Sequence, residues 1–275
     1  MKLNIPIIAA YFSVGSFLYM IVTRLTSNPS IFVNREALVV ICGGMVLAAL
    51  VSFPWIALRQ CFHAIKKIMT DPPKTPTAEA REIVRLAGFA QKNLQNLDDE
   101  IEKIEHPFLK EAVELILDGL PRAFVHETLE KRISERREAL SQDANVVMSL
   151  SKYSPALGLA ATVLGLVDLL GKLGSADMTE LGLGMATALS ATFYGITIAN
   201  LIFAPLSELL ISAGETDHKT RELILDGVMA LIDRKHPLLV AVTVNSHLPI
   251  RDRIDFSGDP QVGGYGGDTV SRMAA

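Results

Sequence analysis

Residues 153–170 read YSPALGLAATVLGLVDLL, and residues 181–207 read LGLGMATALSATFYGITIANLIFAPLS. Each stretch is apolar over about the 20 residues that cross a bilayer as a helix. In both, small or hydroxyl-bearing residues recur at steps of three and four, which keeps them on one helical face. Such a face lets helices pack closely in lipid, and its hydroxyls supply oxygen there. The two stretches therefore predict membrane helices that handle an ion.

Two threonines, Thr162 and Thr192, lie near the middle of these stretches. The small residues on the same two faces are Pro155, Gly158, Gly165, Ala188, Gly195 and Ala199. Hard cations prefer oxygen ligands, so both threonine hydroxyls are candidates to line an ion path. In the alternative interpretation each hydroxyl bonds to its own helix backbone, as membrane threonines commonly do.

The composition also indicates a membrane protein, because 49% of the 275 residues are hydrophobic and only 20% are charged. Two more uncharged stretches, 5–22 and 37–58, bring the prediction to four transmembrane helices. Lysine and arginine gather after the second helix, before the third and after the fourth, which predicts that these flanks and both termini are cytoplasmic. No basic stripe indicates a nucleic-acid partner.

The fold class predicted is an all-α membrane protein in five parts. They are transmembrane helices 1 and 2 (1–58), a cytoplasmic helical domain inserted between helices 2 and 3 (59–152), transmembrane helices 3 and 4 (153–212), a cytoplasmic helical tail (213–254) and a disordered, glycine-rich end (255–275). Within the insertion we expect one helix ending near Gln95, a second from Pro107 to about Leu117, and a third from Pro121 toward Lys152.

Several motifs resemble the flagellar motor stator subunits of the MotA/PomA type, which belong to the MotA/TolQ/ExbB proton channel superfamily. The motifs are SPALGLAATVLGLV at 154–167, ALSATFYG at 188–195 with Asn200 and Pro205 after it, Gly43-Gly44, Asp118-Gly119 and LDGV at 225–228. The resemblance covers roughly residues 1 to 250.

The resemblance implies a homopentamer in the bacterial cytoplasmic (inner) membrane, around a single-span, peptidoglycan-anchored partner of the MotB/PomB type. That partner carries the aspartate that binds the transported cation, sodium or proton. A rotor switch protein of the FliG type would receive the torque. No cofactor, metal site or catalytic residue is implied, and the chain is predicted not to be an enzyme.

The family pattern also assigns roles to single residues. Pro155 and Pro205 match two prolines with a hinge or coupling role, because proline removes a helical hydrogen bond. Thr162, Thr192 and Tyr194 fall on the ion pathway. The small residues expected to face the partner are Gly158, Gly165, Ala188 and Gly195. For the prolines the alternative is a helix cap or a kink without mechanical role, and for Tyr194 it is plain packing.

At the rotor interface the pattern places Arg85, with Lys92 as a second candidate. The glutamate that the family carries eight residues later is replaced by Asn93. Thr162 resembles the sodium-driven branch, whereas Asn34 stands where sodium-type sequences carry aspartate. Asp168, which the pattern does not require, either attracts cations at the outer mouth of the channel or is simply hydrated at the interface.

Three other classes of function fit the sequence less well. An ExbB/TolQ-like energiser of outer-membrane transport is the runner-up, but such chains usually have three membrane helices. A secondary transporter should show broken helices or polar substrate groups inside the membrane. An enzyme or metal protein is disfavoured because the six histidines form no metal-like spacing: His63, His106, His126, His218, His236 and His247.

Overall fold

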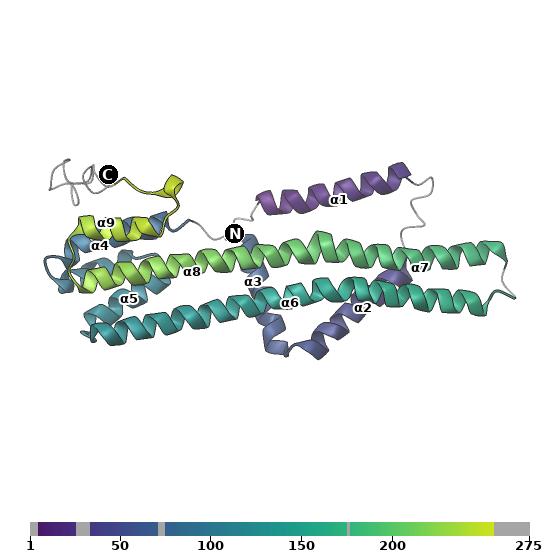
Figure 1. The fold of residues 1–275 in the computed structure, drawn as a ribbon, viewed down its shortest axis with the longest axis horizontal. Helices are drawn as coiled ribbons and strands as arrows, with labels where there is room; N and C mark the ends of the chain where they lie inside the picture. Colours follow the sequence, from purple (N-terminus) through teal and green to yellow (C-terminus); the bar gives the residue numbers. More distant parts are fainter. Residues whose placement is uncertain (1–4, 26–33, 71–74, 175–176, 256–275) are drawn as a thin grey trace. The chain divides into compact units, whose positions relative to one another are not determined.

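The computed structural model describes residues 5–25, 34–70, 75–174 and 177–255. It is built from α1 (Ile5–Leu25), α2 (Arg35–Ser52), α3 (Trp55–Thr70), α4 (Thr77–Ala90), the 3-10 helix η2 (Leu94–Lys103), α5 (Pro107–Leu117), α6 (Arg122–Gly171), α7 (Met178–Ile198), the π-helix η3 (Ala199–Phe203), α8 (Ala204–Ile232), α9 (Pro237–Ser246) and the 3-10 helix η4 (Ile250–Asp252) (Figure 1). In these residues the chain has helices and no strand, so the all-α prediction is confirmed.

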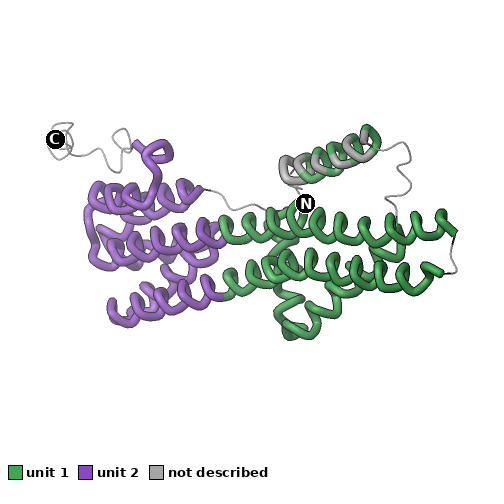
Figure 2. The backbone as a smooth tube through the Cα atoms, turned by 45° about the vertical axis from the view of Figure 1, so that its right-hand side comes forward, with its two compact units in different colours: residues 1–72, 139–213 green, residues 73–138, 214–275 purple. Residues whose placement is uncertain are grey.

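The chain divides into two compact units (Figure 2). Unit 1 comprises 1–72 and 139–213, and unit 2 comprises 73–138 and 214–275. The predicted insertion is therefore shared between the units. Both of its ends belong to unit 1, and its middle folds with the tail in unit 2. The reason is hydrophobic contact, since buried residues of α4, α5 and the start of α6 form one core with α8 and α9.

Candidate membrane spans are found by length and hydropathy at Arg35–Ser52, within Arg122–Gly171 and within Met178–Ile232. The described part of the chain thus has three candidate spans, whereas the sequence predicts four transmembrane helices. The remaining prediction, the uncharged stretch 5–22, coincides with α1, a helix of 21 residues.

Unit 1 is held together by small and branched residues at helical spacing. On α2, Ala37, Ile41 and Met45 recur every fourth residue, and they form a buried cluster with Ala191 of α7. Asn34 begins α2 by accepting a hydrogen bond from Ala37 N at 3.1 Å. This packing places α2 against the ion-path candidates of α7.

Unit 2 has a core built from apolar residues at helical spacing. The periodic residues of α4 and α6 are almost fully buried: Ile83, Leu86, Ala87, Ala90, Val125, Leu129 and Ile133. Gly227 on α8 faces α4 so closely that an added Cβ would lie 2.7 Å from Ile83 Cγ2. A glycine at this point of α8 therefore allows α4 and α8 to approach.

Element ends differ from the prediction in two places. The first helix of the insertion, α4, ends at Ala90 and not near Gln95, because Asn93 caps the separate helix η2 by accepting from Gln95 N. The third, α6, does not stop at the membrane boundary but continues to Gly171. The prediction for α5 is confirmed. The glycine-rich end predicted to be disordered lies outside the described residues beyond 255.

Candidate functional site

The glycines of the small-residue faces bring α6 and α7 into direct contact. A Cβ added to Gly195 would lie 2.7 Å from Ser154 O, and one added to Gly158 would lie 2.9 Å from Ala191 O. Real Cβ atoms essentially never approach that closely. One added to Gly165 would lie 2.9 Å from the Cβ of Ala188. The two helices can therefore pack backbone to backbone only because these positions lack side chains.

The small residues predicted to face a partner subunit contact a helix of the same chain, and their contact with a partner stays a prediction. Gly158, Ala188 and Gly195 are buried, and Gly165 is half-buried, against a helix of the same chain. The physical reason is that the two faces are complementary to each other. A partner helix would have to lie beside this contact.

Thr162 and Thr192 meet across the same contact, with 2.5 Å between their hydroxyl oxygens. Thr162 Oγ1 is buried and lies 2.7 Å from Ala188 O and 3.0 Å from Gly158 O, the carbonyl four residues earlier. A hydroxyl has one proton and two lone pairs, so when Thr162 donates to a carbonyl, Thr192 donates to Thr162. The lone pairs of the half-buried Thr192 then stay available to a cation.

Tyr194 connects α7 to the beginning of α2. Its hydroxyl accepts from the backbone N of Asn34 at 3.1 Å, and Asn34 Nδ2 donates to Thr187 Oγ1 at 2.7 Å. Asn34 also caps α2, so one side chain fixes the helix start and its attachment to α7. Tyr194 thus bonds to the start of α2 within the chain, and its place on the ion pathway stays a prediction.

A π-helix that the sequence did not predict precedes Pro205. In η3 the N–H of Ala204 reaches back to Ala199 O, and the wider turn makes room for the proline ring. Two α6 hydroxyls bond to carbonyls of this region: Ser151 Oγ donates to Ala199 O at 3.2 Å, and Ser154 Oγ donates to Gly195 O at 2.9 Å. In the sequence, Pro205 and the serines of α6 were the residues that could have indicated an irregular turn here.

The other predicted membrane residues have simpler surroundings. Pro155 lies inside the continuous helix α6 and is half-buried. Asp168 is two-thirds exposed and pairs with Lys172 at 2.6 Å, so its negative charge is largely balanced by a neighbour one turn away. This pairing favours the hydrated-interface interpretation of Asp168.

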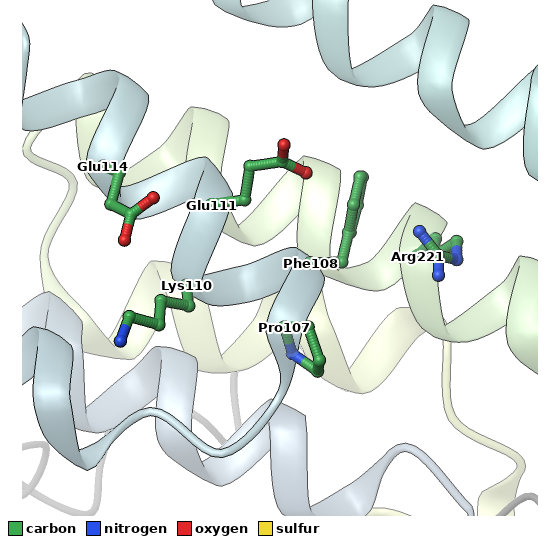
Figure 3. A pocket seen from close by; sticks show the side chains of 6 residues that line it. All are labelled: Pro107, Phe108, Lys110, Glu111, Glu114 and Arg221. Carbon is green, nitrogen blue, oxygen red and sulfur yellow. The ribbon is translucent and has the colours of Figure 1, made fainter.

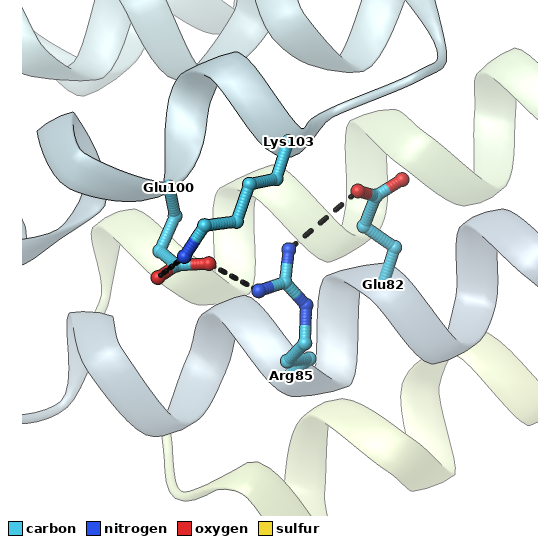
Figure 4. A network of polar contacts seen from close by, with 4 residues as sticks. All are labelled: Glu82, Arg85, Glu100 and Lys103. Atoms are coloured by element: carbon cyan, nitrogen blue, oxygen red, sulfur yellow. Dashed lines mark hydrogen bonds and ion pairs between the residues drawn. The ribbon is translucent and has the colours of Figure 1, made fainter.

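In unit 2, Arg85 is held in a network of charges (Figure 4). Its guanidinium pairs with Glu100, and also lies 3.7 Å from Glu82; Lys103 donates to Glu100 at 2.7 Å. The Glu100 side chain is only 8% exposed. Hydrogen bonds from Lys103 and Arg85 lower the pKa of Glu100. The predicted rotor residue Arg85 is thus bound within the subunit, whereas the predicted Lys92 is exposed.

A Glu100→Gln variant is expected to lower the thermal unfolding midpoint at pH 7, because two cations lose their carboxylate. Since the native pKa of Glu100 is depressed, its stabilisation is present above the unfolded value of about 4.5 and is lost as pH falls through the native one. Circular dichroism melts of the purified chain at pH 7 and below pH 4 check this. Asp98→Asn, an exposed change in the same helix, is the control; an equal effect of both variants at pH 7 would contradict the assignment.

Unit 2 also has an open surface pocket of about 430 Å³ (Figure 3). It is lined by Pro107, Phe108, Lys110, Glu111, Glu114 and Arg221. The Arg221 guanidinium lies 4.7 Å from the ring centre of Phe108, and its Nε donates to Asp217 at 2.7 Å. The central cation is therefore already paired. Among the described residues no group of histidine, cysteine, aspartate and glutamate could hold a metal ion.

The chain is similar in sequence to known proteins. Residues 100–222 match the model of the MotA/TolQ/ExbB proton channel family, a range that contains both motifs at 154–167 and 188–195. Chemotaxis protein PomA of Vibrio alginolyticus is 28% identical over 239 residues, which cover 86% of this chain and 92% of PomA. Motility protein A of Borreliella burgdorferi is 31% identical over 172 residues, 62% of this chain and 65% of that protein.

Two solved structures share the fold. The structure of C. jejuni MotAB matches with a TM-score of 0.83 at 19% identity, covering 95% of this chain and all of that one. The flagellar MotAB stator complex from Bacillus subtilis matches with a TM-score of 0.78 at 23% identity, covering 92% and 98%. With the family match and the sequence relatives, these findings confirm the resemblance that the motifs predicted.

Proposed function

We propose, on the premise that this chain belongs to the MotA/TolQ/ExbB proton channel family, that it is an ion-conducting stator subunit of the bacterial flagellar motor. The observation that carries the proposal is the Thr162–Thr192 pair at the α6–α7 contact, in a chain similar over most of its length to PomA. The ExbB/TolQ-like alternative is less well supported, since the relatives and folds described above are stator proteins.

The mechanism that we infer divides the work between two chains. The partner of the MotB/PomB type supplies the ion-binding aspartate, and this chain supplies hydroxyl oxygen through Thr192, oriented by Thr162. One elementary charge crossing 100 mV releases about 2.3 kcal/mol, which can drive a conformational step. The π-turn before Pro205 is the point of α7 and α8 at which such a step would bend the chain, because its backbone bonding is already irregular.

The assembly follows from the same premise. We propose four transmembrane helices, with α1 as the first, in the cytoplasmic membrane with both termini in the cytoplasm. The basic residues Arg59, Lys66 and Lys67 after α2 support this orientation. We further propose a homopentamer around the partner, with unit 2 acting on a FliG-type rotor protein through exposed charges such as Lys92. Arg85 would then act by holding η2 in place.

The function is tested by expressing the chain with its partner in a strain that lacks its own stator genes. We expect swimming to be restored, and to be lost when the partner's membrane aspartate is changed to asparagine. Restoration of outer-membrane transport in a strain lacking ExbB, with no restored swimming, would support the alternative instead.

The coupling ion is tested with Thr162→Ala at fixed proton-motive force, comparing swimming speed with and without sodium. If sodium is the ion, wild-type speed depends on sodium, and the variant has reduced sodium-driven torque at normal membrane levels. The reason is that Thr162 orients the Thr192 oxygen. Unchanged wild-type speed without sodium would exclude sodium coupling, and loss of the variant from the membrane would mean that the hydroxyl is structural.

A further inference from the structure

Helix α3 is separated from the candidate membrane span that precedes it. The span α2 ends at Ser52, Phe53 is extended, and Pro54 cannot donate to a continued helix (Figure 1). The carbonyl of Pro54 then accepts from Ala57 N at 2.9 Å and Leu58 N at 3.3 Å, which starts α3 in a new direction. Because only two residues separate the helices, α3 begins where the span ends.

The inner face of α3 fixes the helix at this level. Cys61 and Ile68 are buried in one cluster with Val147 of α6 and Leu210 of α8. Val147 precedes the apolar stretch that begins at Tyr153 by six residues, or about 9 Å of helix. Both the break after α2 and these contacts thus place α3 at the boundary between apolar and polar parts of unit 1.

The outer face of α3 alternates aromatic and basic side chains. Trp55, Arg59, Phe62 and Lys66 follow at steps of four, three and four, so they form one stripe. Trp55 is 71% exposed and Phe62 is 68% exposed, and both basic residues are exposed. The exposed Ile56 and Lys67 lie on the flank of this stripe. Hereafter this face is called the α3 stripe.

We propose that the α3 stripe binds the anionic headgroups of phospholipids at the membrane surface. Large aromatic side chains favour the headgroup level, and long basic side chains reach from there to phosphate. The occupant is anionic lipid and not an apolar protein surface, because three cations lie among three apolar side chains on a helix that begins directly after a candidate span. No acidic residue occurs in α3 to oppose such binding.

The test uses the fluorescence of Trp55, since the chain contains one tryptophan. The full-length protein is placed in lipid nanodiscs of phosphatidylcholine and phosphatidylglycerol, in which either one or the other lipid carries brominated acyl chains that quench tryptophan. We expect brominated phosphatidylglycerol to quench at a mole fraction at least about fivefold lower than brominated phosphatidylcholine, because a factor of about five corresponds to the roughly 1 kcal/mol that a single basic residue contributes near an anionic surface. Salt at 1 M should remove the preference, since the screening length falls to about 3 Å.

The variant Arg59→Gln/Lys66→Gln should lose the preference for phosphatidylglycerol. Its quenching by brominated phosphatidylcholine should persist, and this persistence would show that α3 still lies in lipid. The matched control is Lys131→Gln/Lys219→Gln, which removes two exposed cations of unit 2 and should keep the wild-type lipid preference. Equal quenching of the wild type by both lipids would overturn the proposal. So would the absence of quenching by either lipid, which would mean that another copy of the chain covers the stripe.

Discussion

A Gly195→Ala variant is expected to abolish or severely reduce swimming. The new Cβ would lie 2.7 Å from Ser154 O and 3.1 Å from Gly158 Cα, and both are backbone atoms that cannot move aside without separating α6 from α7. Separation would break the Thr162–Thr192 pair and the bond from Ser154 to Gly195 O. Swimming in soft agar and the amount of chain in the membrane are the measurements.

The control is Gly182→Ala in the same helix, where nothing lies within 4 Å of an added Cβ. Alanine favours a helix over glycine by up to about 1 kcal/mol, so intrinsic propensity would make both variants more stable, not less. A difference between the two variants therefore measures close packing alone. Wild-type swimming by Gly195→Ala would show that α6 and α7 do not need this approach.

A Pro205→Ala variant is expected to gain thermal stability and to lose swimming by severalfold. Alanine supplies the missing N–H and lacks the ring for which the wider turn makes room, so it allows the regular α-helical bonding that proline prevents. Regular bonding would then compete with the π-turn at Ala199–Phe203, and the stiffer helix would no longer bend there. Thermal unfolding in detergent and tethered-cell rotation measure the two effects separately.

Pro107→Ala provides the comparison, because Pro107 lies in the first turn of α5, where a missing N–H costs little. This variant should leave both stability and rotation close to wild type. If Pro205→Ala became more stable and still rotated normally, the π-turn would be a tolerated irregularity and not a hinge.

Much of the fold could be predicted from the sequence because the periodicities are strong. The apolar residues of α4 and of the first part of α6 lie at helical steps and are buried in the core, and the helix predicted at Pro107–Leu117 is present as α5. The division of the insertion between two units could not be predicted, since it depends on contacts between residues as distant as Ile83 and Gly227. Local patterns carry no information on which distant helix covers a face.

The sequence indicated which residue types make up the candidate site, but it did not indicate which residues or helices contact one another there. Thr162 and Thr192 were predicted to line an ion path, and the structure shows that their hydroxyls are neighbours, while their role on an ion path stays a prediction. Likewise, the stripe of glycines indicated close packing without revealing which helix would lie against it. The family pattern assigns Arg85 to the rotor interface. Its pairing with Glu100 could not be predicted, because Glu100 lies fifteen positions away, beyond the reach of helical spacing.

The discontinuity of unit 2 has a consequence for chimaeras between related chains. Its core draws on residues 80–133 and on residues 223–248, which lie on either side of the membrane helices in the sequence. Exchanging only the insertion would pair half of one protein's core with half of another's, including the fit of Gly227 against Ile83. A chimaera therefore has to take both segments of unit 2 from the same protein. We also expect substitutions in the two segments to have occurred together as the family diverged.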